Sequence, residues 1–307
     1  MFTAHNYITN HNKSLTREQL KHLKEKAFTG YELVQATARV CAMNMMLHGI
    51  GSEKSVPVVV GDALAADPGE RFEVVLANPP FGKKSSTVIV GEDGRTSTEK
   101  DTIERDDFWA TTSNKQLNFV QHIKTLLATH GRAAVVLPDN VLFEGGAGET
   151  IRKKLLHECD VHTLLRLPTG LFYAQGVKAN VVFFEKKGAS ETPWTRQLWI
   201  YDLRTNKHFT LKTRPLKFED LQEFIDCYHP DNRHERTVTE RFKYFSYDEL
   251  IARDKASLDI FWLKDDSLDN LDDLPSPDVL QQEIIDHLEA ALAAFRDVAA
   301  SLPKSST

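Results

Sequence analysis

Residues 72–81 read FEVVLANPPF, a strand-like run that leads directly into a stiff turn. The run Phe72–Ala77 is mostly apolar, as expected for a strand in the interior of a sheet. Pro79 and Pro80 each fix φ and have no backbone N–H, so the turn is rigid and its carbonyls face outward as acceptors. Ligands of an open parallel sheet bind beyond the carboxyl ends of its strands. The sequence therefore predicts a ligand site at Asn78–Phe81.

The chemistry of this turn suits an amino group on a flat ring. The side-chain oxygen of Asn78 and the carbonyl of Pro79 can both accept from one exocyclic amine, which localises its lone pair for attack. Phe81 stands close enough to stack on the ring, and stacking would offset the cost of flipping a base out of a duplex. We therefore predict Asn78, Pro79, Pro80 and Phe81 as catalytic residues. The alternative is a purely structural turn, because Asn-Pro-Pro is a common turn-starter.

Around this stretch, apolar runs with the period of a strand alternate with runs that have the period of a helix. We expect helices over 16–26, 34–49, 114–130, 149–158 and 277–302, and strands over 27–33, 56–60, 72–77, 132–137, 161–167, 177–185 and 196–203. Such alternation indicates an α/β fold, with a mainly parallel sheet covered on both faces. We place a catalytic core in residues 1–190 and a mixed, partly helical region in residues 191–307.

Three further segments have an open interpretation. Residues 82–113 lack a sustained period, and a loop of roughly 30 residues inside a domain is more often functional or disordered than filler. Gly145–Gly148 could bind a phosphate at a helix start, although a flexible cap is the favoured interpretation because no Gly-x-Gly-x-x-Gly spacing is present. The apolar stripe of the helix at 277–302 suits core packing or a partner surface equally.

The charge of the chain bears on its ligands. The 307 residues carry a net charge of −6, and acidic residues concentrate in 259–278. A protein that grips DNA alone is usually basic, so either the substrate is not nucleic acid or another polypeptide supplies most phosphate contacts. No apolar stretch reaches the length of a membrane span, and the first residues do not resemble a secretory signal. We expect a cytoplasmic protein that does not bind a membrane.

The cysteines argue against a disulfide framework and against a metal site. Cys41, Cys159 and Cys227 are far apart and form no CxxC pair, which favours reduced thiols. The segment Cys227-Tyr228-His229, together with His234, could be imagined as a metal site. Its spacing matches no standard zinc template, so we expect no metal.

Beyond these local patterns, five runs resemble the modification subunits of type I restriction-modification systems. They are GYELVQATARVCAMNMMLHGIG (30–51), GDALAADPGERFEVVLANPPFG (61–82), RAAVVLPDNVLFEGGAGETIRKKLL (132–156), LLRLPTGLFYAQGVKANVVFFEKK (164–187) and LDIFWLKDDSL (258–268). The resemblance implies a Rossmann-like, S-adenosylmethionine-dependent methyltransferase that modifies adenine N6 in DNA. It also implies a specificity subunit that reads the sequence, a restriction (motor-nuclease) subunit and a second modification subunit as partners. A partner that reads the DNA would account for the acidic balance.

The resemblance also assigns roles to individual residues. Asn78, Pro79 and Phe81 match the catalytic motif of the family, and Asn78 also borders the cofactor. Glu32 matches the acidic residue that bonds the ribose hydroxyls of S-adenosylmethionine, unless it is simply an exposed glutamate at a strand end. Asp62 matches the acidic position near the adenine ring of the cofactor, unless it only forms the turn in Gly-Asp-Ala.

One family element is missing from the sequence. The family carries an Asp-Pro-x-x-Gly-Thr-Gly-Gly-Phe stretch after its first strand, and the sheet implied here lacks that strand. The strands at 27–33 and 72–77 would then lose their shared neighbour, and each buried group left unsatisfied costs about 1–3 kcal/mol. We therefore expect an N-terminally truncated chain that is inactive unless an upstream polypeptide completes it.

Other functions remain as alternatives. Asn-Pro-Pro-aromatic also serves methylation of a glutamine side chain (N5) in protein, where the fourth residue is usually Tyr; Phe81 and the runs near residues 167 and 258 argue against that substrate. A non-catalytic, truncated assembly subunit would explain the missing glycine stretch, whereas the intact turn opposes it. A dinucleotide-dependent oxidoreductase is excluded, because no strand–GxGxxG–helix unit exists.

Overall fold

The computed structural model describes residues 1–81, 86–90, 96–100, 102–172, 177–265 and 281. The expected helix at 277–302 therefore lies outside the described residues, apart from Gln281. The chain divides into two compact units, 1–72 with 82–128 and 73–81 with 129–307. Within the described ranges, no helix combines the length and the apolar character that a membrane span requires.

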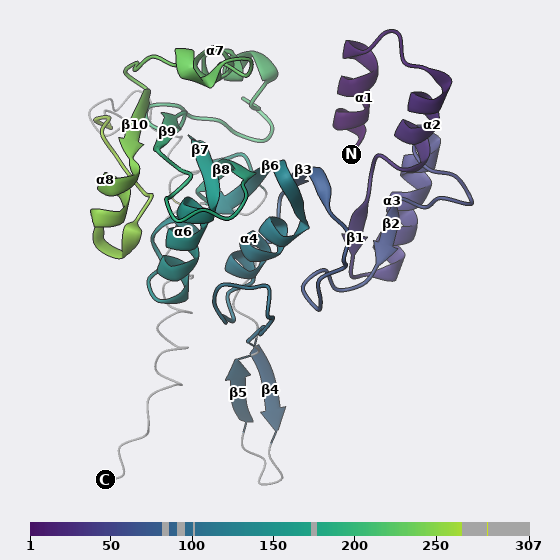
Figure 1. The fold of residues 1–307 in the computed structure, drawn as a ribbon, viewed down its shortest axis with the longest axis horizontal. Coiled ribbons are helices and arrows are strands. Elements are labelled where there is room, and N and C mark those ends of the chain that lie inside the picture. The colour runs from purple at the N-terminus through teal and green to yellow at the C-terminus, as the bar shows by residue number, and fades with distance from the viewer. Residues whose placement is uncertain (82–85, 91–95, 101, 173–176, 266–280, 282–307) are drawn as a thin grey trace. The chain divides into compact units, whose positions relative to one another are not determined.

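The first unit begins with helices and a short parallel sheet (Figure 1). Its elements up to residue 60 are α1 (Phe2–His11), α2 (Arg17–Glu25), β1 (Gly30–Glu32), α3 (Gln35–Leu47) and β2 (Val58–Val60). Helix α2 follows Thr16, whose side chain accepts a hydrogen bond from the Gln19 N–H, the usual role of an N-cap. Strands β1 and β2 pair in parallel, with Glu32 opposite Val60. The helix predicted at 16–26 and the strand predicted to end at Glu32 are confirmed.

Helix α3 presents its larger apolar residues outward. Val40, Met43 and Leu47 share one face, as the sequence period indicated, but they are 68%, 65% and 85% exposed. The buried side of the helix is instead formed by Ala38 and Met45. The helical spacing of apolar residues shows which residues share a face of the helix. The elements that pack against the helix in the tertiary structure decide which face is buried.

The described parts of the segment after Phe81 contain secondary structure that the sequence did not indicate. Its described residues form an antiparallel pair, β4 (Ser86–Val90) with β5 (Thr96–Lys100), and a bridge between Ile103 and Thr112. The expectation of a long loop without secondary structure was wrong for these residues. The β-branched side chains of both strands favour an extended backbone, although the run is too short to show a clear period.

Residues 103–112 are fixed on helix α4 (Lys115–Leu126), which follows Asn114 as its N-cap. Arg105 makes two hydrogen bonds to the Asp107 carboxylate, at 2.9 and 2.7 Å, and the Thr125 hydroxyl donates to the same carboxylate. Burial and the nearby Arg105 lower the pKa of His122 to about 4. The imidazole is therefore neutral at physiological pH.

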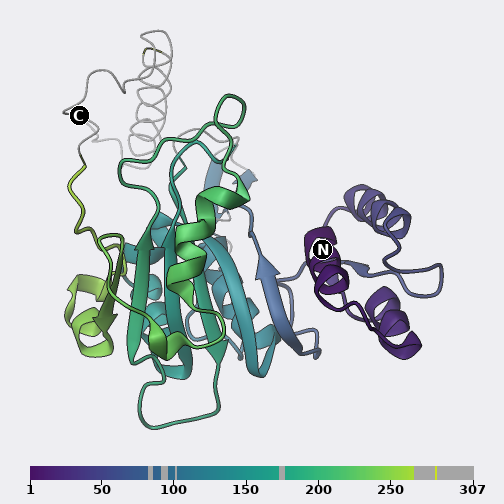
Figure 2. The ribbon, with the colours of Figure 1, turned by 90° about the horizontal axis from the view of Figure 1, so that it is seen from above.

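The second unit is built on a six-stranded sheet with the order β10-β9-β7-β8-β6-β3 (Figures 1 and 2). The strands are β3 (Phe72–Ala77), β6 (Leu127–Pro138), β7 (Cys159–Arg166), β8 (Ala179–Lys186), β9 (Gln197–Asp202) and β10 (Phe242–Ser246). Strand β8 pairs antiparallel with β6 and β7, β9 pairs parallel with β7, and β10 pairs antiparallel with β9. The sheet is mixed, so the expectation of a mainly parallel sheet was wrong. Strand β8 starts at the edge where β7 ends, so it runs antiparallel to both of its neighbours, β6 and β7.

Short helices connect and cover these strands. They are α5 (Asp139–Phe143), α6 (Ala147–Glu158), α7 (Gln222–Tyr228) and α8 (Tyr247–Ala252), with single 3-10 turns at Phe218–Leu221, Arg233–Glu235 and Asp254–Ala256. The side chain of Arg152 in α6 is buried and donates to the carbonyls of Val141, Glu144 and Ala256. One guanidinium thereby ties α5, α6 and the turn before residue 257 together. Strands on both sides of residue 190 belong to this sheet, and a domain boundary there stays a prediction.

Strand β3 forms an open edge of the sheet. Among the described strands, β1 pairs only with β2 and β3 only with β6, as expected for two strands without a shared neighbour. Val74 and Leu76 in β3 are 50% and 64% exposed. An exposed apolar edge strand is a surface on which another chain segment can pair.

Candidate active site

The tetrapeptide Asn78–Phe81 directly follows β3. Pro79 is buried, Phe81 is half-buried, and Asn78 and Pro80 are exposed. The Asn78 side chain makes no hydrogen bond to any residue that the structure describes. Its amide oxygen is therefore available to a ligand, while the proline that follows it is held in place by packing.

The ring of Phe81 is anchored at one edge of the sheet. It meets the ring of Phe172 edge-on, with centroids 5.2 Å apart and an interplanar angle of 82°. It also packs against the core cluster that contains Leu167, Ala179 and Leu203. These three residues lie just past the end of β7, at the start of β8 and just past the end of β9. The tetrapeptide therefore lies at the edge where β7 and β9 end.

Phe172 was not singled out from the sequence. It lies in the run LPTGLF (167–172), which follows a strand and contains a Pro and a Gly typical of a turn. An aromatic residue in a turn at the end of a strand is a weak signal on its own. Its contact with Phe81 becomes visible only once both strands are placed in the sheet.

A buried ion pair crosses the same edge. Arg204 makes two hydrogen bonds to Asp139, at 2.7 and 2.8 Å, and also donates to the carbonyls of Leu167 and Ala179. Asn180 donates to the same carboxylate at 2.8 Å. Burial by itself raises the pKa of Asp139, but the hydrogen bonds and the charge of Arg204 outweigh it, so the net pKa is lowered. One arginine thus joins the ends of β6, β7 and β9 to the start of β8.

A second buried arginine holds residues 258–264 along this edge. The Arg166 side chain is 1% exposed and pairs with Asp259 at 3.1 Å, while its guanidinium lies 3.8 Å from the centre of the Phe261 ring. The Leu258 N–H donates to the carbonyl of Leu142, which lies in α5. The run LDIFWLK, noted in the sequence only for its resemblance, therefore passes over the end of β7.

Glu32 and Asp62 lie together at the end of the β1–β2 pair in the first unit. The Gly61 N–H donates to the Glu32 carbonyl at 3.0 Å, which brings the two strand ends into register. Glu32 accepts the Val34 N–H at 2.8 Å through one carboxylate oxygen, and Asp62 accepts the Leu64 N–H at 2.9 Å in the same way. The second oxygen of each carboxylate has no hydrogen-bond partner among the described residues. The pair fits the hydroxyl and amino donors of a nucleoside, so it fits that half of S-adenosylmethionine.

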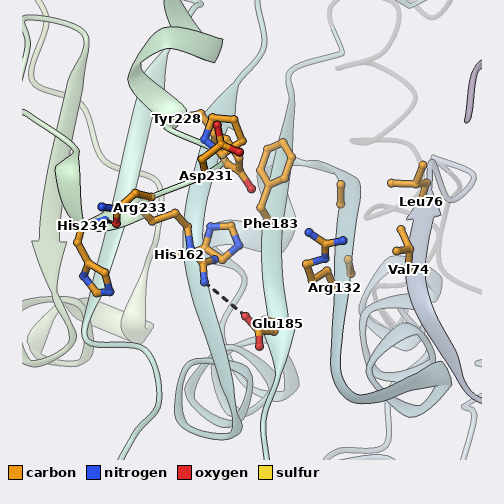
Figure 3. A pocket seen from close by; sticks show the side chains of 14 residues that line it. Val74, Leu76, Arg132, His162, Phe183, Glu185, Tyr228, Asp231, Arg233 and His234 are labelled. Atoms are coloured by element: carbon orange, nitrogen blue, oxygen red, sulfur yellow. Dashed lines mark hydrogen bonds and ion pairs between the residues drawn. The ribbon is translucent and has the colours of Figure 1, made fainter. Parts of the chain in front are cut away.

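A cavity of about 500 Å³ lies elsewhere, on the sheet face next to Tyr228 (Figure 3). Its lining includes Val74 and Leu76 of β3 but not the residues of the tetrapeptide. Burial lowers the pKa of His162 in this cavity to about 2, so the imidazole stays neutral. Arg233 is 3.4 Å from Glu185, the contact drawn as a dashed line. This cavity lacks two acceptors beside an aromatic ring, and we do not assign the reaction to it.

Two other candidate sites find a structural explanation. Gly146 precedes α6 with φ +60°, and the N–H groups of Gly148 and Thr150 donate to the carbonyls of Gly145 and Gly146. These donors already have partners, which favours a cap over a phosphate site. Among the residues that the structure describes, no three His, Cys, Asp or Glu side chains are grouped as a metal would require.

Gly170, two residues before Phe172, provides a test of the packing at the end of the sheet where β7 and β9 end. Its φ is +83°, and a Cβ added there would overlap the carbonyl of Phe209. We expect Gly170→Ala to lower the free energy of unfolding by about 1–3 kcal/mol, as residues forced into a rare backbone region do. Denaturant unfolding measures this loss. Gly188→Ala is the control, because a Cβ at Gly188 meets no atom within 4 Å; equal effects of both changes would contradict the packing described here.

The mixed α/β sheet, with an Asn-Pro-Pro-Phe turn after its edge strand, agrees with the methyltransferase fold that the sequence resemblance implies. Within that class, residues 3–260 match the model of the N-6 DNA methylase family. The chain belongs to this family.

Known relatives agree with this assignment. The chain is 40% identical over 318 residues to the type I restriction enzyme EcoKI methylase subunit of Escherichia coli (strain K12), covering 90% of this chain and 57% of that protein. It is 40% identical over 306 residues to the StySPI methylase subunit of Salmonella potsdam, covering 87% and 55%. The crystal structure of the EcoKI M protein matches with a TM-score of 0.71 and 35% identity, over 98% of this chain and 66% of that one. The chain thus spans little more than half the length of these curated relatives.

Proposed function

We propose that this chain is the methyl-transferring part of a type I modification subunit, which methylates adenine N6 in DNA with S-adenosylmethionine as the donor. The observation that carries the proposal is the exposed amide of Asn78, which bonds to no described residue, at the edge where β7 and β9 end. Beside it, the ring of Phe81 is braced by Phe172. Two acceptors and an aromatic face are the groups that an exocyclic amine on a flipped base requires.

In this proposal each residue of the turn has a defined task. The Asn78 side-chain oxygen and the Pro79 carbonyl accept the two hydrogens of the adenine amine and draw its nitrogen toward tetrahedral geometry. Phe81 stacks on the base and offsets part of the lost base stacking. Pro80 keeps the turn rigid. The bound cofactor supplies an electrophilic methyl group on a sulfonium.

The carboxylates of Glu32 and Asp62 would hold the cofactor. Among the described residues they offer acceptors for its nucleoside half, and no glycine-rich turn directly follows a described strand to meet its methionine half. We therefore expect the chain alone to bind S-adenosylmethionine weakly, with a Kd above roughly 100 μM, which corresponds to about 5–6 kcal/mol. Isothermal titration calorimetry measures this. Micromolar binding that Glu32→Ala leaves unchanged would contradict both the weak site and the role of Glu32.

We propose that the partners are a specificity subunit that reads the target, a restriction subunit and a second modification subunit, in the cytoplasm. The support is that the relatives named above are methylase subunits of type I restriction enzymes. The test is transfer of tritiated methyl groups to unmethylated DNA by the assembled complex. Release-factor protein serves as the competing substrate, because labelled glutamine there, with no label in DNA, would replace the proposal with a protein methyltransferase.

A non-catalytic subunit that serves assembly only is the alternative that the sequence left open, and none of the comparisons favours it. A pull-down with the specificity subunit, scored beside methyl transfer in the same preparation, separates the two candidates. Binding without any transfer in the assembled complex would leave only the assembly role.

A further inference from the structure

Residues 203–217 form a strongly basic loop after β9, which we call the basic loop. It contains three lysines and two arginines (Lys207, Lys212, Lys217, Arg204 and Arg214) and a histidine, and no Asp or Glu. The whole chain, by contrast, has 44 acidic and 38 basic residues. Positive charge is therefore concentrated in a segment of an otherwise acidic protein.

Three of these cations point to a ligand outside the chain. Lys212, Arg214 and Lys217 are exposed, and none of them forms an ion pair with a residue that the structure describes. Arg204 is different, because it is used internally by Asp139. Exposed lysines and arginines on most surfaces have acidic neighbours that reduce the local potential. Within the basic loop itself no acidic residue provides that compensation, and the acidic group beside it is Asp220, which accepts the Lys217 N–H at 2.8 Å.

The tip of the basic loop is a defined turn. The Thr210 hydroxyl accepts the N–H groups of Thr213 and Arg214, at 3.1 and 2.8 Å, and the Thr210 N–H donates to the Arg214 carbonyl at 3.0 Å. Phe209 is 5% exposed and lies under the Arg214 guanidinium, 5.4 Å from it. These bonds fix the backbone that carries Lys212 and Arg214, which lowers the entropy lost on binding.

The basic loop packs against the run 167–172, which holds the aromatic ring that braces the candidate active site. The carbonyl of Phe209 contacts Gly170 so closely that no Cβ fits between them. Gly170 precedes Phe172 by two residues, and Phe172 braces Phe81. Figure 2 shows the green segment between β9 and α7 extending past the end of the sheet strands. A polyanion bound to this loop would therefore lie beside the catalytic turn.

We propose that the basic loop binds the sugar–phosphate backbone of the DNA next to the flipped adenine, through Lys212, Arg214 and Lys217. This inference rests on the proposed function and extends it, because it gives this chain phosphate contacts of its own. Duplex DNA carries one negative charge per about 1.7 Å of axis, so it can engage several cations of one loop at once. The acidic remainder of the chain restricts where DNA can approach.

The test compares two triple variants of the full chain. One is K212Q/R214Q/K217Q; the control is K153Q/K154Q/R196Q, which removes the same charge at exposed positions elsewhere in the second unit. Lys153 and Lys154 form only exposed pairs within α6, so their loss costs little stability. The probe is a fluorescein-labelled duplex of any sequence, because phosphate contacts do not read bases. Fluorescence anisotropy gives the Kd over a series of salt concentrations, and thermal melts check folding.

The expected result is a smaller salt dependence for the basic-loop variant only. Three lost phosphate contacts reduce the slope of log K against log[salt] by about 2.7. Between 50 and 200 mM salt, the affinity of the wild type then falls about 40-fold more than that of the variant. The control variant should keep the slope of the wild type.

Each other outcome has a definite meaning. Equal slopes for the wild type and the basic-loop variant, with methyl transfer intact in the assembled complex, would overturn this inference and leave the proposed function standing. A wild-type chain that binds no duplex at 50 mM salt would also overturn it. The expected slopes without methyl transfer in any completed complex would support the surface and remove the proposed function.

Discussion

The variant Asn78→Ala is expected to transfer methyl groups to DNA at least about a hundredfold more slowly than the wild type in the assembled complex. Removing one preorganised hydrogen-bonding group from a reacting centre typically costs about 10²–10³ in rate. The loss should appear in kcat, because the amide acts on the reacting nitrogen and contributes little to the affinity for the duplex. Single-turnover transfer of tritiated methyl groups measures it.

The same variant should remain folded. Asn78 is exposed and its side chain bonds to no described residue, so its free energy of unfolding should change by no more than about 0.5 kcal/mol. Asn44→Ala is the matched control, because Asn44 is exposed on α3 and its side chain also has no described partner. An Asn78→Ala complex that methylates DNA at the wild-type rate would remove Asn78 from the reaction and with it the proposed mechanism.

The variant Arg204→Met is expected to lower the free energy of unfolding by about 3–5 kcal/mol, the typical cost of removing one partner of a buried ion pair. The change leaves the Asp139 carboxylate without its bidentate partner and the Leu167 carbonyl without its donor, while the Ala179 carbonyl keeps the Leu167 N–H. For a chain of this size, a melting temperature lower by roughly 10 °C would follow. Arg196→Met serves as the control, because Arg196 is exposed and its side chain has no described partner.

The pH dependence of this effect has a predictable sign. In the wild type the folded pKa of Asp139 lies below its ordinary 3.8, so its contribution to stability is present above that value and is lost as the pH falls through the folded pKa. Without Arg204, burial raises the pKa of the carboxyl, which then takes up a proton more readily in the folded state. The stability gap between variant and wild type should therefore narrow from pH 7 to pH 4. A gap that stays constant over this range would show that Asp139 is not the source of the loss.

Some features of the molecule could be predicted from the sequence, because each depends only on residues that are close together in the chain. The strand Phe72–Ala77 and the rigid turn after it follow from an apolar run and two prolines, whose φ does not depend on tertiary contacts. The start of α2 at Thr16 follows from a capping box within four residues. The catalytic and cofactor roles of Asn78, Phe81, Glu32 and Asp62 stay predictions.

Other contributions could not be predicted, because they join residues far apart in the chain. One example is the contact between Phe81 and Phe172. Another is the ion pair between Arg204 and Asp139, two residues that are 65 positions apart. Both exist only because β6, β7, β8 and β9 are neighbours in the sheet. The spacing of apolar residues within one segment carries no information about the order or direction of the strands. For this reason the sequence indicated a mainly parallel sheet and not the mixed sheet that is observed. The charge total left two interpretations open, a substrate other than nucleic acid or a partner that supplies the phosphate contacts, and it could not show that the basic loop lies against Gly170.

The sequence by itself determined the strand, the stiff turn and the chemical groups that the turn can offer to an amine, since each depends on residues next to one another. The tertiary structure alone decided which aromatic ring braces Phe81, which arginine joins the strand ends, and that the basic loop lies against Gly170. Those contacts depend on packing between distant segments, and packing is selected by the free energy of the whole unit and not by any short run of residues.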